Sequence, residues 1–184
     1  MEGLQNKIVL ITGGSKGIGY GVAESLLMEG AKVAITSRRQ KAADEAVHKL
    51  SGKGEIIGLE ADVRRATAQQ LAVDAVIKKW GKLDVLIANA GLGHFGNIET
   101  LTHEQWLETI DTNLTGVFYS IKACLSELKK SKGYIITMAS LAGTNFFAGA
   151  SAYNASKFGL VGFSQAVMLD LRAYGIKVTT IMPG

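Results

Sequence analysis

The sequence predicts an α/β protein in which a doubly wound parallel sheet lies between two layers of helices. Short apolar segments alternate strictly with longer segments of helical periodicity, which is typical of β-α-β units. The apolar segments have no polar face, as in Ile8–Ile11 and Val85–Ala88, and this indicates parallel strands covered by helices on both sides. Right-handed crossovers then predict a three-layer α/β/α arrangement.

Six short apolar segments, each bounded by glycine or polar residues, are the predicted strands. They are Lys7–Thr12, Lys32–Ser37, Glu55–Ala61, Leu83–Ala88, Gly133–Ala139 and Lys177–Met182. Longer segments with apolar residues at helical spacing are the predicted helices. They are Gly17–Glu29, Lys41–Leu50, Ala66–Trp80, His103–Lys130 and Ala152–Tyr174. The chain contains no linker, repeat or low-complexity segment, so residues 1–184 are expected to form a single domain.

Composition and charge argue against several classes of protein. With 47% hydrophobic and 20% charged residues, the chain can bury a core. It has neither an apolar run long enough to span a membrane nor the apolar segment of a signal peptide, so a cytoplasmic protein is expected. The net charge of +4 is not gathered in a basic-aromatic stripe, which argues against nucleic acid as a partner. We expect no metal site, and the single Cys124 fits an apolar helical pattern.

A glycine-rich loop joins the first predicted strand to the first predicted helix. It has the order T-G-x-x-x-G-x-G, with glycines at Gly13, Gly17 and Gly19. Glycines let backbone amides approach a pyrophosphate closely, and the start of the helix adds partial positive charge. An ordinary turn is the alternative interpretation. The position between a strand and a helix favours nucleotide binding and a Rossmann-type fold.

The end of the second predicted strand bears on the type of nucleotide. An acidic residue there usually binds the ribose 2′-hydroxyl group and would repel a 2′-phosphate. The strand instead ends in Ser37 followed by Arg38 and Arg39, and a guanidinium can hold a phosphate through paired hydrogen bonds. Lys16 in the glycine loop could add a second cation. Solvated surface charges are the alternative, but the missing acid favours NADP(H).

A tyrosine and a lysine at the start of the last long helix form the candidate catalytic group. Tyr153 and Lys157 are four residues apart and therefore share a helix face, where the ammonium group would stabilise a phenolate. Ser140 follows the fifth strand, at the edge of the sheet where such folds bind ligands. Asn113 interrupts a helical pattern despite its poor helix propensity, which suggests a polar role. Taken singly, Ser140 could be a turn residue, Asn113 a helix defect and Lys157 a surface charge.

In this order, the motifs resemble those of the short-chain dehydrogenase/reductase family, and the glycine spacing is that of its short-subunit branch. The resemblance implies that Tyr153 is the general acid/base, and that Lys157 assists it and binds the nicotinamide ribose. It also implies that Ser140 orients the substrate and that Asn113 holds a water in a proton relay. The extended, epimerase-like branch uses a different glycine spacing.

For the cofactor, the resemblance implies that Lys16 and Arg38 mark NADP preference and that Asp62–Val63 contacts the adenine ring. Without the resemblance, Asp62 could equally be a helix cap or turn residue. The residues expected to contact NADP(H) are Gly13, Ser15, Lys16, Gly17, Ile18, Gly19, Ser37, Arg38, Asp62, Val63, Asn89, Ala90, Gly91, Tyr153, Lys157, Pro183 and Gly184.

The expected function is transfer of a hydride between NADP(H) and a carbonyl or secondary alcohol, within one dinucleotide-binding and catalytic domain. Apolar residues next to the candidate catalytic group suggest a hydrophobic or acyl-type substrate. These candidate lining residues are Leu92, Gly93, His94, Phe95, Leu141, Ala142, Asn145, Phe146 and Phe147. A non-catalytic NADP-binding protein, or an inactive fragment, is the alternative.

The resemblance also raises expectations about length and assembly. Relatives continue beyond the Pro183–Gly184 element with a substrate loop and a seventh strand, so a C-terminally truncated form of a longer protein is expected. Relatives are usually dimers or tetramers. We therefore expect a homodimer or homotetramer, with a dimer interface through helices 103–130 and 152–174.

Overall fold

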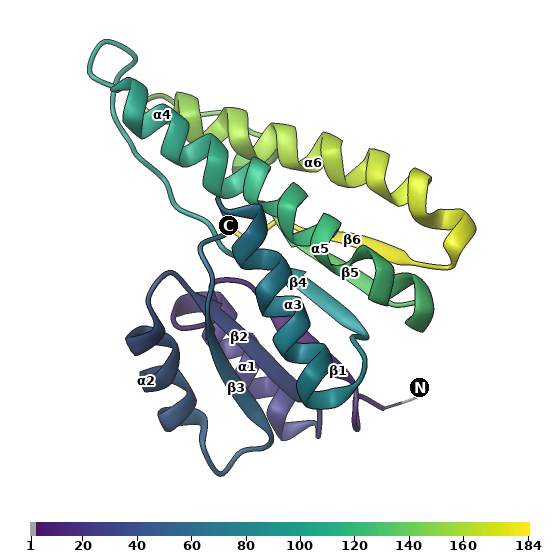
Figure 1. Ribbon diagram of the computed structural model, residues 1–184. Coiled ribbons are helices and arrows are strands. Elements are labelled where there is room, and N and C mark those ends of the chain that lie inside the picture. Colours follow the sequence, from purple (N-terminus) through teal and green to yellow (C-terminus); the bar gives the residue numbers. More distant parts are fainter. Residues whose placement is uncertain (1–2) are drawn as a thin grey trace.

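The computed structural model describes residues 3–184, which form a six-stranded sheet with helices on both faces (Figure 1). Neighbouring strands are parallel throughout, in the order β3-β2-β1-β4-β5-β6. The strands are β1 (Ile8–Ile11), β2 (Lys32–Ser37), β3 (Ile56–Glu60), β4 (Val85–Ala88), β5 (Tyr134–Met138) and β6 (Lys177–Ile181). The predicted doubly wound, three-layer fold is therefore confirmed.

The helices follow the strands in the predicted order. They are α1 (Gly17–Met28), α2 (Gln40–Leu50), α3 (Ala66–Trp80), α4 (His103–Ile110), α5 (Gly116–Ser131) and α6 (Ser151–Leu171). Short 3-10 segments cover Leu141–Gly143 and Arg172–Tyr174. The predicted helix 152–174 thus ends at Leu171 in α-helical geometry and finishes in a 3-10 turn, which closes on Gly175 at a positive φ of 72°.

The inner strands divide their side chains between two separate cores. In β1, Ile8 and Leu10 pack with residues of α3, α5 and α6, whereas Val9 and Ile11 pack with residues of α1 and α2. Because successive side chains of a strand point to opposite faces, a strand between two cores needs apolar residues at every position. This explains the uninterrupted apolar sequence of β1, in which no residue is more than 2% exposed.

The outer strands β3 and β6 form the two edges of the sheet. Most of β3 is half-buried, and in β6 the side chains of Lys177, Thr179 and Ile181 are exposed. The expectation that strands are covered on both faces therefore holds for the inner strands only. An edge strand has a neighbour on one side and fewer helices over it.

The predicted helix 103–130 is helical over its whole length, but it is not α-helical throughout, and this refines the sequence-based prediction. A π-helical turn, Asp111–Thr115, separates α4 from α5. Such a turn adds a residue to one helical turn, and it often occurs at functional sites because it redirects a side chain. Asn113 lies in this turn and is 0% exposed. The poor helix propensity of asparagine was the only sequence signal for this break.

Three expectations drawn from composition bear on the described residues. Among residues 3–184, no helix is long and apolar enough to span a membrane. Over the same range, no three His, Cys, Asp or Glu side chains are grouped as metal ligands would be. Cys124 is 1% exposed in the core, and burial raises the pKa of its thiol, which confirms its interpretation as a core residue.

Candidate active site

The glycine loop between β1 and α1 is held against the end of β4. The Thr12 hydroxyl oxygen accepts hydrogen bonds from the backbone N–H groups of Asn89 (3.0 Å) and Ala90 (3.1 Å). In return, the Asn89 side-chain amide donates to the carbonyl oxygens of Thr12 (2.9 Å) and Gly13 (3.1 Å). These four bonds fix the separation of two adjacent strand ends, so the loop has a defined shape.

Two glycines of the loop are required by close approach. Gly13 has a φ of 65°, and a Cβ there would lie 2.8 Å from the Ala90 Cα. A Cβ on Gly19 would collide with the Asn89 amide and lie 2.8 Å from the Gly13 carbonyl oxygen. Gly17 also has a positive φ, of 57°, but a Cβ there would meet no protein atom within 4 Å. Gly13 and Gly19 therefore allow the ends of β1 and β4 to meet, and Gly17 leaves open space at the start of α1.

A cavity of about 370 Å³ lies over this loop and the ends of β2, β3 and β4. It is lined by Gly13, Ser15, Lys16, Gly17, Ile18, Ser37, Arg38, Ala61, Val63, Asn89, Ala90, Gly91, Leu92 and Thr112. A neighbouring cavity of about 490 Å³ holds four cationic side chains, those of Lys16, Arg38, Arg39 and Arg64. The structure thus brings together most of the residues that the sequence assigned to the cofactor.

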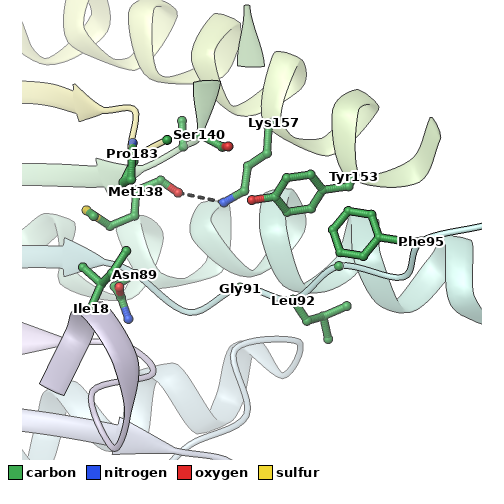
Figure 2. A pocket seen from close by; sticks show the side chains of 13 residues that line it. Ile18, Asn89, Gly91, Leu92, Phe95, Met138, Ser140, Tyr153, Lys157 and Pro183 are labelled. Carbon is green, nitrogen blue, oxygen red and sulfur yellow. Dashed lines mark hydrogen bonds between the residues drawn. The ribbon is translucent and has the colours of Figure 1, made fainter. Parts of the chain in front are cut away.

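A further cavity of about 440 Å³ contains the candidate catalytic group (Figure 2). It is lined by Ile18, Asn89, Gly91, Leu92, Gly93, Phe95, Met138, Ala139, Ser140, Tyr153, Lys157, Pro183 and Gly184. Four of these residues, Ile18, Asn89, Gly91 and Leu92, also line the cavity over the glycine loop. The two cavities are therefore parts of one crevice at the carboxyl ends of the strands, where doubly wound sheets bind ligands.

Lys157 reaches this crevice from α6 and is 5% exposed. Its ammonium group donates a hydrogen bond of 2.8 Å to the carbonyl oxygen of Met138, the last residue of β5. Figure 2 shows the Tyr153 hydroxyl directed toward the Lys157 amine, and the amine lies 5.6 Å from the centre of the Tyr153 ring. Burial lowers the pKa of Lys157 from 10.5 to about 8.

Ser140 follows Ala139 just beyond the end of β5, with its hydroxyl beside the same cavity. Its oxygen accepts a hydrogen bond of 3.1 Å from the Ala142 backbone N–H and so starts the short 3-10 turn. The Leu141 N–H donates to the Pro183 carbonyl oxygen at 2.9 Å, which holds the chain after β6 against this turn. Ser140, from the segment after β5, and Tyr153 and Lys157, from α6, are thereby gathered at one cavity, as expected from the sequence.

Asn113 lies behind the crevice and does not line it. Its amide donates to the Leu92 carbonyl oxygen (2.8 Å) and to the Ser156 hydroxyl (2.9 Å), and its side-chain oxygen accepts from the Leu92 N–H (2.9 Å). A Cβ on Gly91 would lie 3.3 Å from the Asn113 side-chain oxygen and 3.6 Å from the Lys157 nitrogen. Asn113 is therefore close to Lys157, with Gly91 between them, and its observed partners are the Leu92 backbone and α6.

The sequence of this chain is similar to those of known enzymes. The family described as short chain dehydrogenase matches residues 7–184 of the chain. The chain belongs to the short-chain dehydrogenase family. It is 33% identical over 182 residues to a 3-oxoacyl-acyl-carrier-protein reductase of Vibrio cholerae, covering 98% of this chain and 74% of that protein. It is also 33% identical over 184 residues to human dehydrogenase/reductase SDR family member 4, covering 98% of this chain and 66% of that protein.

Solved structures of other short-chain dehydrogenases superpose closely. An alcohol dehydrogenase from Thermococcus sibiricus complexed with 5-hydroxy-NADP has a TM-score of 0.93 at 27% identity, covering 98% of this chain and 77% of that one. A 3-ketoacyl-acyl-carrier-protein reductase from Brucella melitensis complexed with NADH has a TM-score of 0.93 at 28% identity, covering 98% of this chain and 76% of that one. Family members with this fold thus bind nicotinamide cofactors with and without a 2′-phosphate.

Within the short-chain dehydrogenase fold, several features of this site were not found from the sequence. The Met138 carbonyl oxygen has no sequence signature, because every residue carries one. Arg64 was not among the residues that the sequence assigned to the site, yet its side chain bonds Asp62 and lines the cationic cavity. The Arg64 N–H also donates to Asp62, so Asp62 is a turn residue as well as a neighbour of the crevice. The hydrogen bond from Arg64 lowers the pKa of Asp62.

The buried Lys157 should make the stability of this protein depend on pH in a specific way. Because its folded-state pKa is lowered to about 8, the unfolded chain holds this proton up to a higher pH than the folded protein does. The contribution of Lys157 to the free energy of unfolding should therefore rise between about pH 8 and about pH 10.5. Relative to Lys157→Met, wild type should gain up to about 3 kcal/mol over this window.

Urea unfolding of both proteins between pH 7 and pH 10.5 measures this difference directly. The comparison with Lys157→Met removes the titration of all other groups, which both proteins share. A difference in unfolding free energy that stays constant over the whole range would contradict the assignment of a strongly buried Lys157.

Proposed function

We propose that this short-chain dehydrogenase transfers a hydride between NADP(H) and a carbonyl or secondary alcohol, with residues 1–184 as one dinucleotide-binding and catalytic domain. The observation that carries the proposal is the continuity of the crevice. Tyr153, Lys157 and Ser140 lie at one part of it, and the glycine loop with Lys16 and Arg38 lies at the other. A cofactor laid along this crevice would bring its reactive end to a proton donor.

The residues present fit a dinucleotide. Gly17 leaves open space at the start of α1, where backbone N–H groups and the helix dipole favour a pyrophosphate. The nearby cavity with Lys16, Arg38, Arg39 and Arg64 favours a 2′-phosphate over a bare ribose. When bound, the cofactor supplies or accepts the hydride, and the protein supplies position and a proton.

The proton step falls to Tyr153. Its hydroxyl, directed toward Lys157, donates a proton to the carbonyl oxygen during reduction and accepts one during oxidation. The Lys157 ammonium stabilises the phenolate that remains, and the Met138 carbonyl fixes that ammonium in place. Ser140 would donate a hydrogen bond to the same carbonyl oxygen and hold it within reach of Tyr153.

The substrate side of the crevice is apolar and partly aromatic. The Phe95 ring lies 5.5 Å from the Tyr153 ring and 6.3 Å from the Phe147 ring. Phe95, Phe147 and the neighbouring Phe146 are 64%, 52% and 85% exposed, so they offer apolar surface beside the proton donor. This surface suits a hydrophobic or acyl-type carbonyl compound, and the similarity to 3-oxoacyl reductases points the same way.

Assembly is part of the proposal. The helices α4 and α6 lie side by side (Figure 1), and apolar side chains along α4, α5 and α6 are exposed, including Leu107 (55%), Phe118 (42%) and Phe158 (43%). Exposed apolar surface of this kind marks association sites. We propose a homodimer that buries this face.

The first test is turnover. NADPH is mixed with a panel of hydrophobic ketones and 3-oxoacyl thioesters, and the nicotinamide absorbance is followed. Tyr153→Phe removes the proton donor and should lower kcat by at least about a hundredfold. Tyr119→Phe, a matched change on α5 outside the crevice, should leave kcat unchanged. Tight NADPH binding without turnover on any substrate would instead favour a non-catalytic binding protein.

The cofactor preference is tested by charge reversal. Arg38→Asp places a carboxylate where the 2′-phosphate would bind, so the Kd for NADPH should rise by about 10–100-fold, while the Kd for NADH should rise little or fall. Arg65→Asp makes the same charge change outside the cavities and serves as the control. Equal effects of Arg38→Asp on both cofactors would rule out this role of Arg38.

The assembly is tested by sedimentation velocity. The expected species has twice the chain mass of 19.5 kDa. Phe118→Asp places a charge on the proposed interface and should shift the population toward the monomer, whereas Leu71→Asp, at an exposed apolar position on α3 outside that face, should not. A wild-type monomer at all concentrations would disprove the interface.

A further inference from the structure

Glu108 of α4 contacts three cationic or basic side chains from separate parts of the fold. One of its carboxylate oxygens lies 3.3 Å from an Arg38 nitrogen and 3.3 Å from an Arg64 nitrogen. The other lies 2.8 Å from the Nε2 atom of His94. The hydrogen bond with His94, together with the charges of Arg64 and Arg38, lowers the pKa of Glu108, so this side chain carries a negative charge.

The contact with Arg38 places Glu108 in competition with a cofactor phosphate. Arg38 lines both the cavity over the glycine loop and the neighbouring cationic cavity. One of the guanidinium nitrogens of Arg38 faces Glu108, so in this arrangement the carboxylate uses a donor that a phosphate bound by Arg38 could otherwise use. The Arg38 side chain is 60% exposed, and exposed ion pairs are weak. A phosphate is a stronger partner, because it carries more charge and accepts paired hydrogen bonds.

The contacts of Glu108 with Arg64 and His94 would keep its carboxylate near the cavity when Arg38 turns from Glu108 to a phosphate. Arg64 is itself held by Asp62 at 2.6 Å. His94 belongs to the loop after β4, and its neighbour Phe95 packs against Tyr153 in the crevice (Figure 2). A carboxylate fixed between these two partners cannot swing away freely. It therefore remains as a negative charge close to any phosphate bound by Arg38.

We propose that Glu108 is a positioning residue that limits how strongly this protein selects NADP(H) over NAD(H), because it competes with the 2′-phosphate for Arg38. The proposal rests on the proposed function, in which Arg38 binds that phosphate. NAD(H) has no 2′-phosphate for which Glu108 could compete, so the effect of Glu108 would be confined to the phosphorylated cofactor. The resulting preference for NADP(H) is moderate.

The test compares the binding of NADPH and NADH, measured by nicotinamide fluorescence with no substrate present. Glu108→Gln keeps the size of the side chain and removes its charge. The Kd for NADPH should fall by about 3–10-fold, within the range that a charge-assisted hydrogen bond controls, and the Kd for NADH should stay within about twofold. The control is Glu104→Gln on the same helix, which removes an exposed charge that has no contact with Arg38 and should change neither Kd.

The dependence of the NADPH Kd on salt concentration is a second measurement, and a purely structural effect of the substitution would not change it. The advantage of Glu108→Gln for NADPH should shrink as NaCl is raised from about 0.05 M to about 0.5 M, because screening weakens interactions between charges near the surface. Glu108→Ala should change the NADPH-to-NADH ratio in the same direction. This second variant covers the case in which glutamine forms new hydrogen bonds.

An unchanged or lowered NADPH affinity in both Glu108 variants, with wild type binding NADPH, would overturn the inference and leave the proposed function intact. Failure of wild type to bind either NADPH or NADH would overturn the proposed function, and the inference with it. A raised affinity for both cofactors equally would also overturn the inference, because it would place Glu108 away from the 2′-phosphate.

Discussion

The parallel pairing of β1 with both β2 and β4 is the constraint on which the rest of this structure depends. The chain builds outward from β1 in one direction through β2 and β3, and then returns to build in the other direction through β4. The helices that connect the first half, α1 and α2, therefore cover one face of the sheet, and α3, α5 and α6 cover the other. Where the two directions part, a crevice remains above β1 and β4. The hydrogen bonds between Thr12 and Asn89 close the floor of this crevice.

The crevice combines two kinds of electrostatic environment. At one part, Lys16, Arg38 and Arg64 lie near the surface, where water and salt moderate their charge. At the other, Lys157 is buried and its ammonium group has the Met138 carbonyl oxygen as its hydrogen-bond partner. A buried cation without a carboxylate partner is costly, and proteins retain such groups where they serve chemistry. The same burial that lowers the pKa of Lys157 strengthens its effect on the adjacent Tyr153 hydroxyl.

The fold and most of the candidate site could be predicted from the sequence because both depend on local patterns. Apolar runs such as Ile8–Ile11 identify inner strands, and the spacing of Tyr153 and Lys157 places them on one helix face whatever surrounds them. The break at Asp111–Thr115 could not be predicted, because a π-turn and a continuous α-helix differ by one residue in the turn. The break is stabilised by contacts of Asn113 with Leu92 and Ser156, which lie 21 and 43 residues away along the chain.

By itself, the sequence determined the order of strands and helices, the glycine loop, and the helix that carries Tyr153 and Lys157, because each is encoded in residues close together along the chain. Only the tertiary structure decided which distant groups became partners. Met138 receives the bond from Lys157 because the fold brings the end of β5 to α6. Glu108 meets Arg38, 70 residues earlier in the chain, because the fold brings the ends of their side chains together. Such contacts depend on the three-dimensional path of the chain, and a charged or carbonyl group carries no sequence mark of the partner it will meet.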